Sequence, residues 1–89
     1  MEWTDASLTH ATEAARALLS RLGLAEYRFT VAPRAELVGV HVQYATLDAW
    51  RSTTLKVDAP QLLASQREPS VQDALLLEWG SRFDHAKYR

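Results

Sequence analysis

The stretch from Leu37 to Val57 reads LVGVHVQYATLDAWRSTTLKV, and its alternation decides the fold. Its first part places apolar side chains at every second position, at Val38, Val40, Val42 and Tyr44. Its last part repeats the pattern at Thr53, Leu55 and Val57. A period of two residues predicts half-buried strands at about 37–44 and 50–57, joined by a hairpin loop around Asp48.

The same alternation is present upstream of this hairpin. Tyr27, Phe29 and Val31 alternate with polar or small residues, which predicts a further strand at about 26–32. Residues 33–36 are enough for a short turn. Connections this short favour antiparallel pairing, because a parallel crossover needs about a dozen residues or more. We therefore expect a three-stranded antiparallel meander.

The N-terminal segment has helical periodicity instead. Apolar residues recur at spacings of three and four, which predicts a helix at about 5–22. Thr4, Asp5 or Ser7 can cap its start, since each side-chain oxygen can accept from a free amide of the first turn. Gly23 can adopt the left-handed conformation that ends many helices.

The C-terminal third is also predicted to be helical. Pro60 suits the first turn of a short helix at about 60–67, because the amide hydrogen that proline lacks is not needed there. Ser70 begins a last helix at about 70–83, in a variant of the capping box. Residues 84–89 are expected to form a frayed polar tail.

These elements predict one small α+β domain over residues 1–89, with the helices packed on one sheet face. A sheet of alternating strands has one apolar face to bury, and the helices must cover it. We expect a single core that contains Leu18, Phe29, Val40, Leu55, Leu75 and Trp79. The second sheet face then looks outward.

Composition narrows the classes of function. Ten basic and eleven acidic residues give a net charge of −1, which attracts neither nucleic acid nor an anionic membrane. The absence of cysteine excludes disulfides, thiolate metal sites and cysteine nucleophiles. The N-terminal residues are acidic and polar, unlike a signal peptide, and the apolar runs are too short to span a bilayer. We expect a cytoplasmic protein without a membrane partner.

The outward sheet face is the first candidate binding surface. It combines potential cations with hydrogen-bonding groups on a rigid platform, which suits an acidic partner. Its expected members are Arg28, Thr30, His41, Gln43, Ser52, Thr54 and Lys56. A polar outward face is also what an ordinary solvated antiparallel sheet presents, so a surface without a partner is the alternative.

Trp50 and Leu77 fall outside the expected core. Trp50 shares the strand parity of Ser52, which places it on the polar face beside the hairpin. Leu77 lies about 160° around its helix from Leu75. Exposed tryptophans are frequent hot spots of protein interfaces. The alternative is that Trp50 folds over the core edge while Leu77 packs on Leu63.

The order of helix, three strands and helix resembles that of double-stranded RNA-binding domains over most of the chain. The resemblance implies phosphate contacts from a lysine-rich cluster at the start of the last helix. Here that stretch is Ser70-Val71-Gln72-Asp73-Ala74, which is acidic and lacks lysine. A single-strand platform needs outward aromatic rings, whereas Tyr27, Phe29 and Tyr44 are expected to face inward. Nucleic-acid binding through the open face is the alternative function.

A small metal-dependent hydrolase is a third possibility. His10 and Glu13 lie three apart on a helix, which supplies half of a metal site, and His41 lies on a strand. Histidines scattered in this way have no ligand spacing, so we expect no metal, no cofactor and no catalytic residue.

The sequence therefore favours a small non-catalytic domain that binds another protein, with a homodimer as one form of that partnership. Phage-encoded inhibitors, immunity proteins and adaptors are domains of this kind. Some anti-CRISPR inhibitors are similar in size and element order, although no motif is shared. The expected partner-binding residues are Trp50, Leu77, Arg28, His41, Gln43, Thr54 and Lys56.

Overall fold

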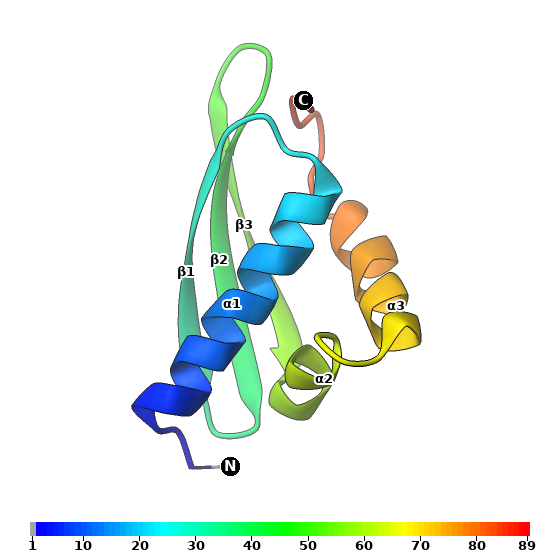
Figure 1. Ribbon diagram of the computed structural model, residues 1–89. Coiled ribbons are helices and arrows are strands. Elements are labelled where there is room, and N and C mark those ends of the chain that lie inside the picture. Colours follow the sequence, from blue (N-terminus) through cyan, green and yellow to red (C-terminus); the bar gives the residue numbers. More distant parts are fainter. Residues whose placement is uncertain (1) are drawn as a thin grey trace.

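The structure is a computed structural model that describes residues 2–89, and it has the predicted α+β architecture (Figure 1). The elements follow the chain as α1 (Asp5–Leu22), β1 (Tyr27–Arg34), β2 (Leu37–Ala45), β3 (Trp50–Asp58), α2 (Ala59–Ala64) and α3 (Pro69–Gly80). None of the helices formed by residues 2–89 combines the length and the hydrophobicity needed to cross a bilayer.

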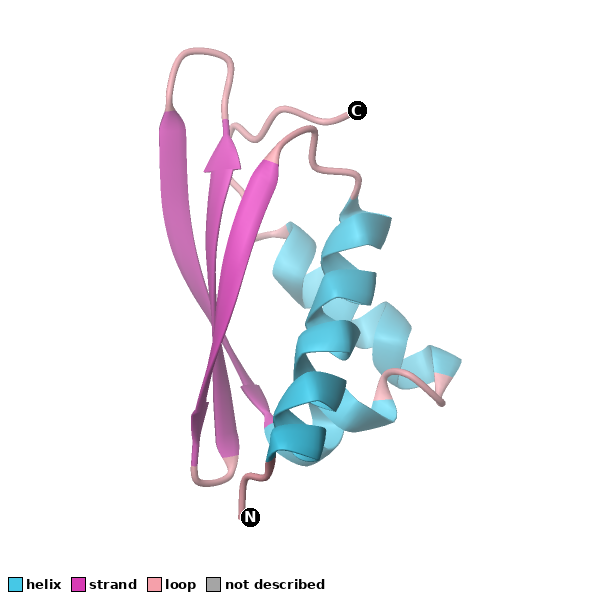
Figure 2. Cartoon of the chain, turned by 60° about the vertical axis from the view of Figure 1, so that its left-hand side comes forward, coloured by secondary structure: helices cyan, strands magenta, loops and turns pink. Residues whose placement is uncertain are grey.

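The three strands form one antiparallel sheet in the order β1-β2-β3. In the middle of the sheet, Val40 pairs with Val31 on one side and with Leu55 on the other. Figure 2 shows the strands as one layer and all the helices on a single side of it. The predicted meander and the single covered face are confirmed.

The core lies between these two layers. Leu18, Val40, Leu55, Leu75 and Trp79 are buried in one cluster, as predicted from the sequence. Phe29 packs against the same cluster but is only half-buried, because β1 is an outer strand. The guanidinium of Arg16 lies over the Phe29 ring, 5.8 Å from its centroid.

Helix α1 begins and ends where its sequence predicts. Thr4 and Ser7 form a capping box, in which the Ser7 amide donates to the Thr4 hydroxyl at 3.1 Å and the Thr4 amide donates to the Ser7 hydroxyl at 2.8 Å. After the last turn, Gly23 has a φ of 80° and its amide donates to the carbonyl of Ser20 at 3.3 Å.

Strand β1 is longer than predicted. It continues through Pro33 to Arg34, and the turn is reduced to Ala35 and Glu36. Proline is tolerated there because β1 is an edge strand and a residue facing the free edge needs no amide donor. Ala35 has a φ of 49°, and its carbonyl accepts a hydrogen bond from the Trp3 indole at 2.8 Å.

The C-terminal helices are shorter than predicted. Helix α2 ends at Ala64, and α3 starts at Pro69 and ends at Gly80 instead of continuing to residue 83. The predicted capping box at Ser70 is wrong, because Glu68 is the N-cap of α3 and makes no side-chain cap bond. Beyond the helix, Phe83 is still buried in the core.

The prediction of a frayed tail is wrong as well. Residues 84 and 85 form a turn, in which His85 has a φ of 60°, and in the segment that follows Ala86 pairs with Thr46 and Tyr88 pairs with Leu24. The Lys87 amide donates to the Ala45 carbonyl at 2.9 Å, and the Lys87 carbonyl accepts from the amide of residue 25 at 2.8 Å. Backbone bonds of this kind need no apolar pattern, so the sequence contains no signal for them.

Candidate functional site

The sheet face opposite the helices is a polar surface that no helix covers (Figure 2). We call it the open face. It consists of Arg28, Thr30, Ala32 and Arg34 of β1, Leu37, Gly39, His41 and Gln43 of β2, and Trp50, Ser52, Thr54, Lys56 and Asp58 of β3. Apart from the half-buried Gly39, every member is exposed. The strand alternation that buries one set of side chains therefore presents the other set on a rigid plane.

The strand register arranges most of the predicted partner-binding residues in adjacent rows. Gln43 lies between Arg28 and Ser52 across the sheet. In the next row, His41 lies between Thr30 and Thr54, and its Nδ1 is 3.0 Å from the Thr54 hydroxyl. Lys56 follows in the third row beside Gly39. The predicted residues of the three strands therefore form one continuous surface.

Trp50 and Arg28 form the main side-chain pair of this surface. The Arg28 guanidinium lies over the Trp50 ring, 5.7 Å from its centroid, although the indole is still 53% exposed. A cation at this distance from a tryptophan ring is attracted by the negative face of the ring. Gln43, Arg51 and Ser52 complete the wall of a shallow hollow of about 360 Å³ beside the pair.

The open face is basic even though the whole chain has a net charge of −1. It carries Arg28, Arg34 and Lys56 but a single carboxylate, Asp58, in the corner next to Leu37. Within residues 2–89, none of these three cations makes an ion pair. The acidic residues that balance the chain lie on the helices and loops, so the face has a positive potential of its own.

Leu77 is not part of this surface. It is 81% exposed and lies on α3, in the helical layer behind the sheet. Its neighbours Leu75 and Trp79 turn into the core, which leaves Leu77 on the far side of the helix from the sheet. The structure therefore separates Leu77 from Trp50, and the two cannot contact one flat partner surface together.

The residues considered for a metal site are also separated. His41 projects from the open face, whereas His10 and Glu13 lie on α1, on the other side of the sheet. In the part of the chain that the structure describes, no three His, Asp or Glu side chains are grouped closely enough to hold a metal ion. The hydrolase hypothesis has no common site for its three residues.

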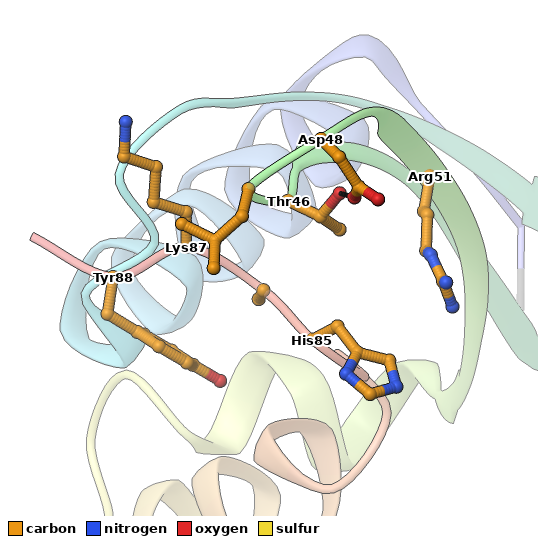
Figure 3. Close-up of a pocket in the computed structure, with 8 residues that line it drawn as sticks. Thr46, Asp48, Arg51, His85, Lys87 and Tyr88 are labelled. Atoms are coloured by element: carbon orange, nitrogen blue, oxygen red, sulfur yellow. Dashed lines mark hydrogen bonds between the residues drawn. The ribbon is translucent and has the colours of Figure 1, made fainter.

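Sequence reasoning missed a hollow of about 890 Å³. It lies between the β2–β3 loop and the C-terminal segment (Figure 3), and it is lined by Thr46, Leu47, Asp48, Arg51, His85, Ala86, Lys87 and Tyr88. The Thr46 hydroxyl donates to Asp48 at 3.2 Å, and His85 makes no hydrogen bond to either residue.

This second hollow adjoins the open face. Arg51 lines both it and the hollow beside Trp50, so the two surfaces meet at the hairpin end of the sheet. The second hollow contributes Arg51 and Lys87 as further cations against one carboxylate, Asp48. The basic character of the open face therefore continues around this end of the molecule.

No family model matches the chain, and no curated protein or solved structure matches it.

Proposed function

We propose that this chain is a small, non-catalytic protein-binding domain that docks an acidic surface of a partner protein on its open face. Inhibitors, immunity proteins and adaptors act in this way, by covering a surface of their partner. The observation that carries the proposal is the pair of Trp50 and Arg28, exposed together on a rigid, helix-free and basic plane. Tryptophan and arginine are the residues most enriched at interface hot spots.

The mixture of side chains on the open face supports a protein partner over a nucleic acid. A single-strand platform stacks successive bases on several large aromatic rings, but Trp50 is the one Trp, Tyr or Phe among the residues of the open face. Tyr27, Phe29 and Tyr44 belong to the core side of their strands. The face also includes the apolar Leu37, which is 46% exposed, and an apolar and polar mixture is typical of protein interfaces.

The size of the face indicates how far the partner extends. Strands of nine residues, with a rise of about 3.3 Å and a spacing of about 4.8 Å, make a plane of about 30 by 14 Å. That plane is about half of the roughly 800 Å² that each partner contributes to a standard interface. A stable partner therefore also covers the adjoining hollow with Arg51 and Lys87.

The test is affinity capture from the native host with matched variants. Trp50→Ser and Arg28→Glu remove the two anchors without touching the core, and each is expected to abolish capture of the partner. Arg67→Glu makes the same charge change at an exposed position between α2 and α3, and it is expected to leave capture unchanged. Capture that is equal for the wild type and both open-face variants would refute the proposal.

A parallel assay addresses the alternative function. Fluorescence anisotropy with random single-stranded and double-stranded oligonucleotides, measured at two salt concentrations, is expected to show no saturable binding. Tight binding that falls steeply with salt and is lost in Arg28→Glu would instead assign the open face to nucleic acid.

A further inference from the structure

The hydrogen bonds at the two ends of β3 show which of its backbone groups are free. The Thr46 amide donates to the Ala49 carbonyl at 2.7 Å, and the Ala59 amide donates to the Glu36 carbonyl at 2.8 Å. Hydrogen-bonded pairs of an antiparallel ladder recur at every second residue. The bonded pairs between these ends are therefore Val38–Val57, Val40–Leu55, Val42–Thr53 and Tyr44–Arg51.

The intervening residues of β3 direct their amides and carbonyls away from β2. These residues are Trp50, Ser52, Thr54, Lys56 and Asp58. Within residues 2–89, the outward backbone groups of Trp50, Ser52, Thr54 and Lys56 make no hydrogen bond. Asp58 is the N-cap of α2, so its carbonyl belongs to the first turn of that helix. A free edge of this length, without proline or a bulge, is a template for pairing with another strand.

The opposite edge of the sheet is a poorer template. The bond from the Ala45 amide to the Glu26 carbonyl, at 3.0 Å, sets the parity of β1. By that parity, the backbone amides and carbonyls of Tyr27, Phe29 and Val31 point to the free edge of β1. Pro33 occupies the next such position, and it has no amide hydrogen to donate. Strand β3 therefore has the longer uninterrupted edge.

We propose that β3 pairs in antiparallel fashion with β3 of a second copy of this chain, about a twofold axis at Thr54. Thr54 then lies opposite the partner's Thr54, and Ser52 lies opposite the partner's Lys56. Trp50 lies opposite the partner's Asp58. The two sheets join into one sheet of six strands, with an isologous interface in which each contact occurs twice.

The side chains of β3 favour this register over registers in which the two strands are shifted along each other. Centring the axis on Thr54 pairs the outward amides and carbonyls of Ser52, Thr54 and Lys56 in both strands, and no like charges lie opposite each other. Centring it on Lys56 would place two ammonium groups face to face and shorten the ladder. Centring it on Ser52 would leave Lys56 and Asp58 without partners. A shift by one residue would turn core-side residues to the open face.

The core side of the edge has room for the second strand. A hollow of about 280 Å³ lies beside the edge, lined by Thr54, Leu55 and Lys56 of β3, by Glu78 and Trp79 of α3 and by Arg82 just beyond that helix. In the proposed register the partner's Thr53 comes opposite Leu55, next to this hollow.

The dimer goes beyond the proposed function and does not depend on it. Edge pairing leaves the open face uncovered and makes the faces of the two copies continuous. A monomer could still dock a partner on that face, and a dimer could form without one. The oligomeric state and the capture of a partner are therefore separate measurements.

The experiment compares two threonines of one row. Sedimentation equilibrium of the wild type at micromolar concentrations is expected to show a dimer. Thr54→Lys places two cations on the twofold axis and is expected to weaken dimerisation about tenfold or more, because like charges meet at the interface. Thr30→Lys is the control: it is the same substitution in the same row of the open face, but on β1.

Complementary charges provide the second arm. The Thr54→Glu variant alone is expected to dimerise as weakly as the Thr54→Lys variant. An equimolar mixture of the two variants is expected to dimerise with the affinity of the wild type. The proposal is overturned if the wild type is a monomer at several hundred micromolar, or if Thr30→Lys weakens the dimer as much as Thr54→Lys. It is also overturned if the mixture is not tighter than either variant, while circular dichroism shows that all the variants are folded.

The register has its own test, because the chain contains no cysteine. In an antiparallel ladder, Thr54→Cys places two thiols about 5 Å apart across the axis, whereas Ser52→Cys places them about 14 Å apart. A short thiol cross-linker is expected to link the first variant to itself and not the second. Equal cross-linking of both variants would exclude the register.

Discussion

Leu75 and Leu77 lie two positions apart on α3 and have opposite environments. Leu75 has no exposed surface, whereas Leu77 is 81% exposed. The difference follows from the helical period, which turns the second leucine away from the sheet. Sequence periodicity predicted that Leu75 is buried and that Leu77 lies off the buried stripe, but it left open whether Leu77 packs on Leu63, and the exposure of Leu77 answers that question.

These two leucines make a matched test of the core. Leu75→Ala is expected to lower the free energy of unfolding by about 2–5 kcal/mol, since it leaves a cavity beside the buried Trp79. Leu77→Ala in the same helix is expected to change it by less than about 0.5 kcal/mol. Urea denaturation followed by tryptophan fluorescence measures both. Equal effects would mean that the helix faces are assigned incorrectly.

At the scale of elements, a glycine ends α1 and directs the chain into the sheet. Gly23 has a φ of 80°, a conformation that a side chain makes costly. A Cβ added there would meet no atom within 4 Å, so strain in the backbone is the whole expected cost. Gly39 differs, because it lies in β2 with an ordinary φ.

This contrast gives a prediction for two equal substitutions. Gly23→Ala is expected to destabilise the fold by about 1–2 kcal/mol, through the left-handed conformation alone. Gly39→Ala is expected to be neutral or slightly stabilising, because its Cβ would lie 3.7 Å from the Ala32 carbonyl, an ordinary contact. Thermal unfolding of both variants measures the difference. A larger loss in Gly39→Ala would contradict the assigned backbone conformations.

At the scale of the whole molecule, the C-terminal segment joins parts of the chain that the meander leaves apart. Its backbone bonds reach the α1–β1 connection at residue 25 and the end of β2 at Ala45. Arg89 adds a third bond, from its amide to the Gly23 carbonyl at 2.8 Å. The same segment forms one wall of the hollow beside the open face.

The contribution of this segment can be measured at one residue. Lys87→Pro removes the amide that donates to Ala45 and is expected to cost about 1–3 kcal/mol, because a carbonyl loses its partner. Lys87→Ala keeps the amide and is expected to cost less than about 0.5 kcal/mol, since the lysine side chain is exposed. Faster hydrogen exchange at Ala25 in the proline variant alone is the expected signature. Unchanged exchange would show that the segment is not held by these bonds.

The sequence by itself determined the elements and the two sides of the sheet. Periods of 2 and 3.6 residues report which side chains are buried, and the Thr4 cap and Gly23 stop are local conformations. The members of the open face were therefore predictable from strand parity, whereas the contact between Trp50 and Arg28 was not. The end of β1 was not predictable, because an edge position tolerates Pro33. The start of α3 was not predictable either, because a proline in its first turn replaces the predicted cap.

Only the tertiary structure decided which surfaces lie together. It separated Leu77 from Trp50 by placing α3 behind the sheet, and it separated His10 from His41 in the same way. It also docked residues 84–89 against β2 and created the hollow that extends the basic surface. These relations depend on backbone hydrogen bonds and on layer packing between distant residues, which leave no periodic pattern in the sequence.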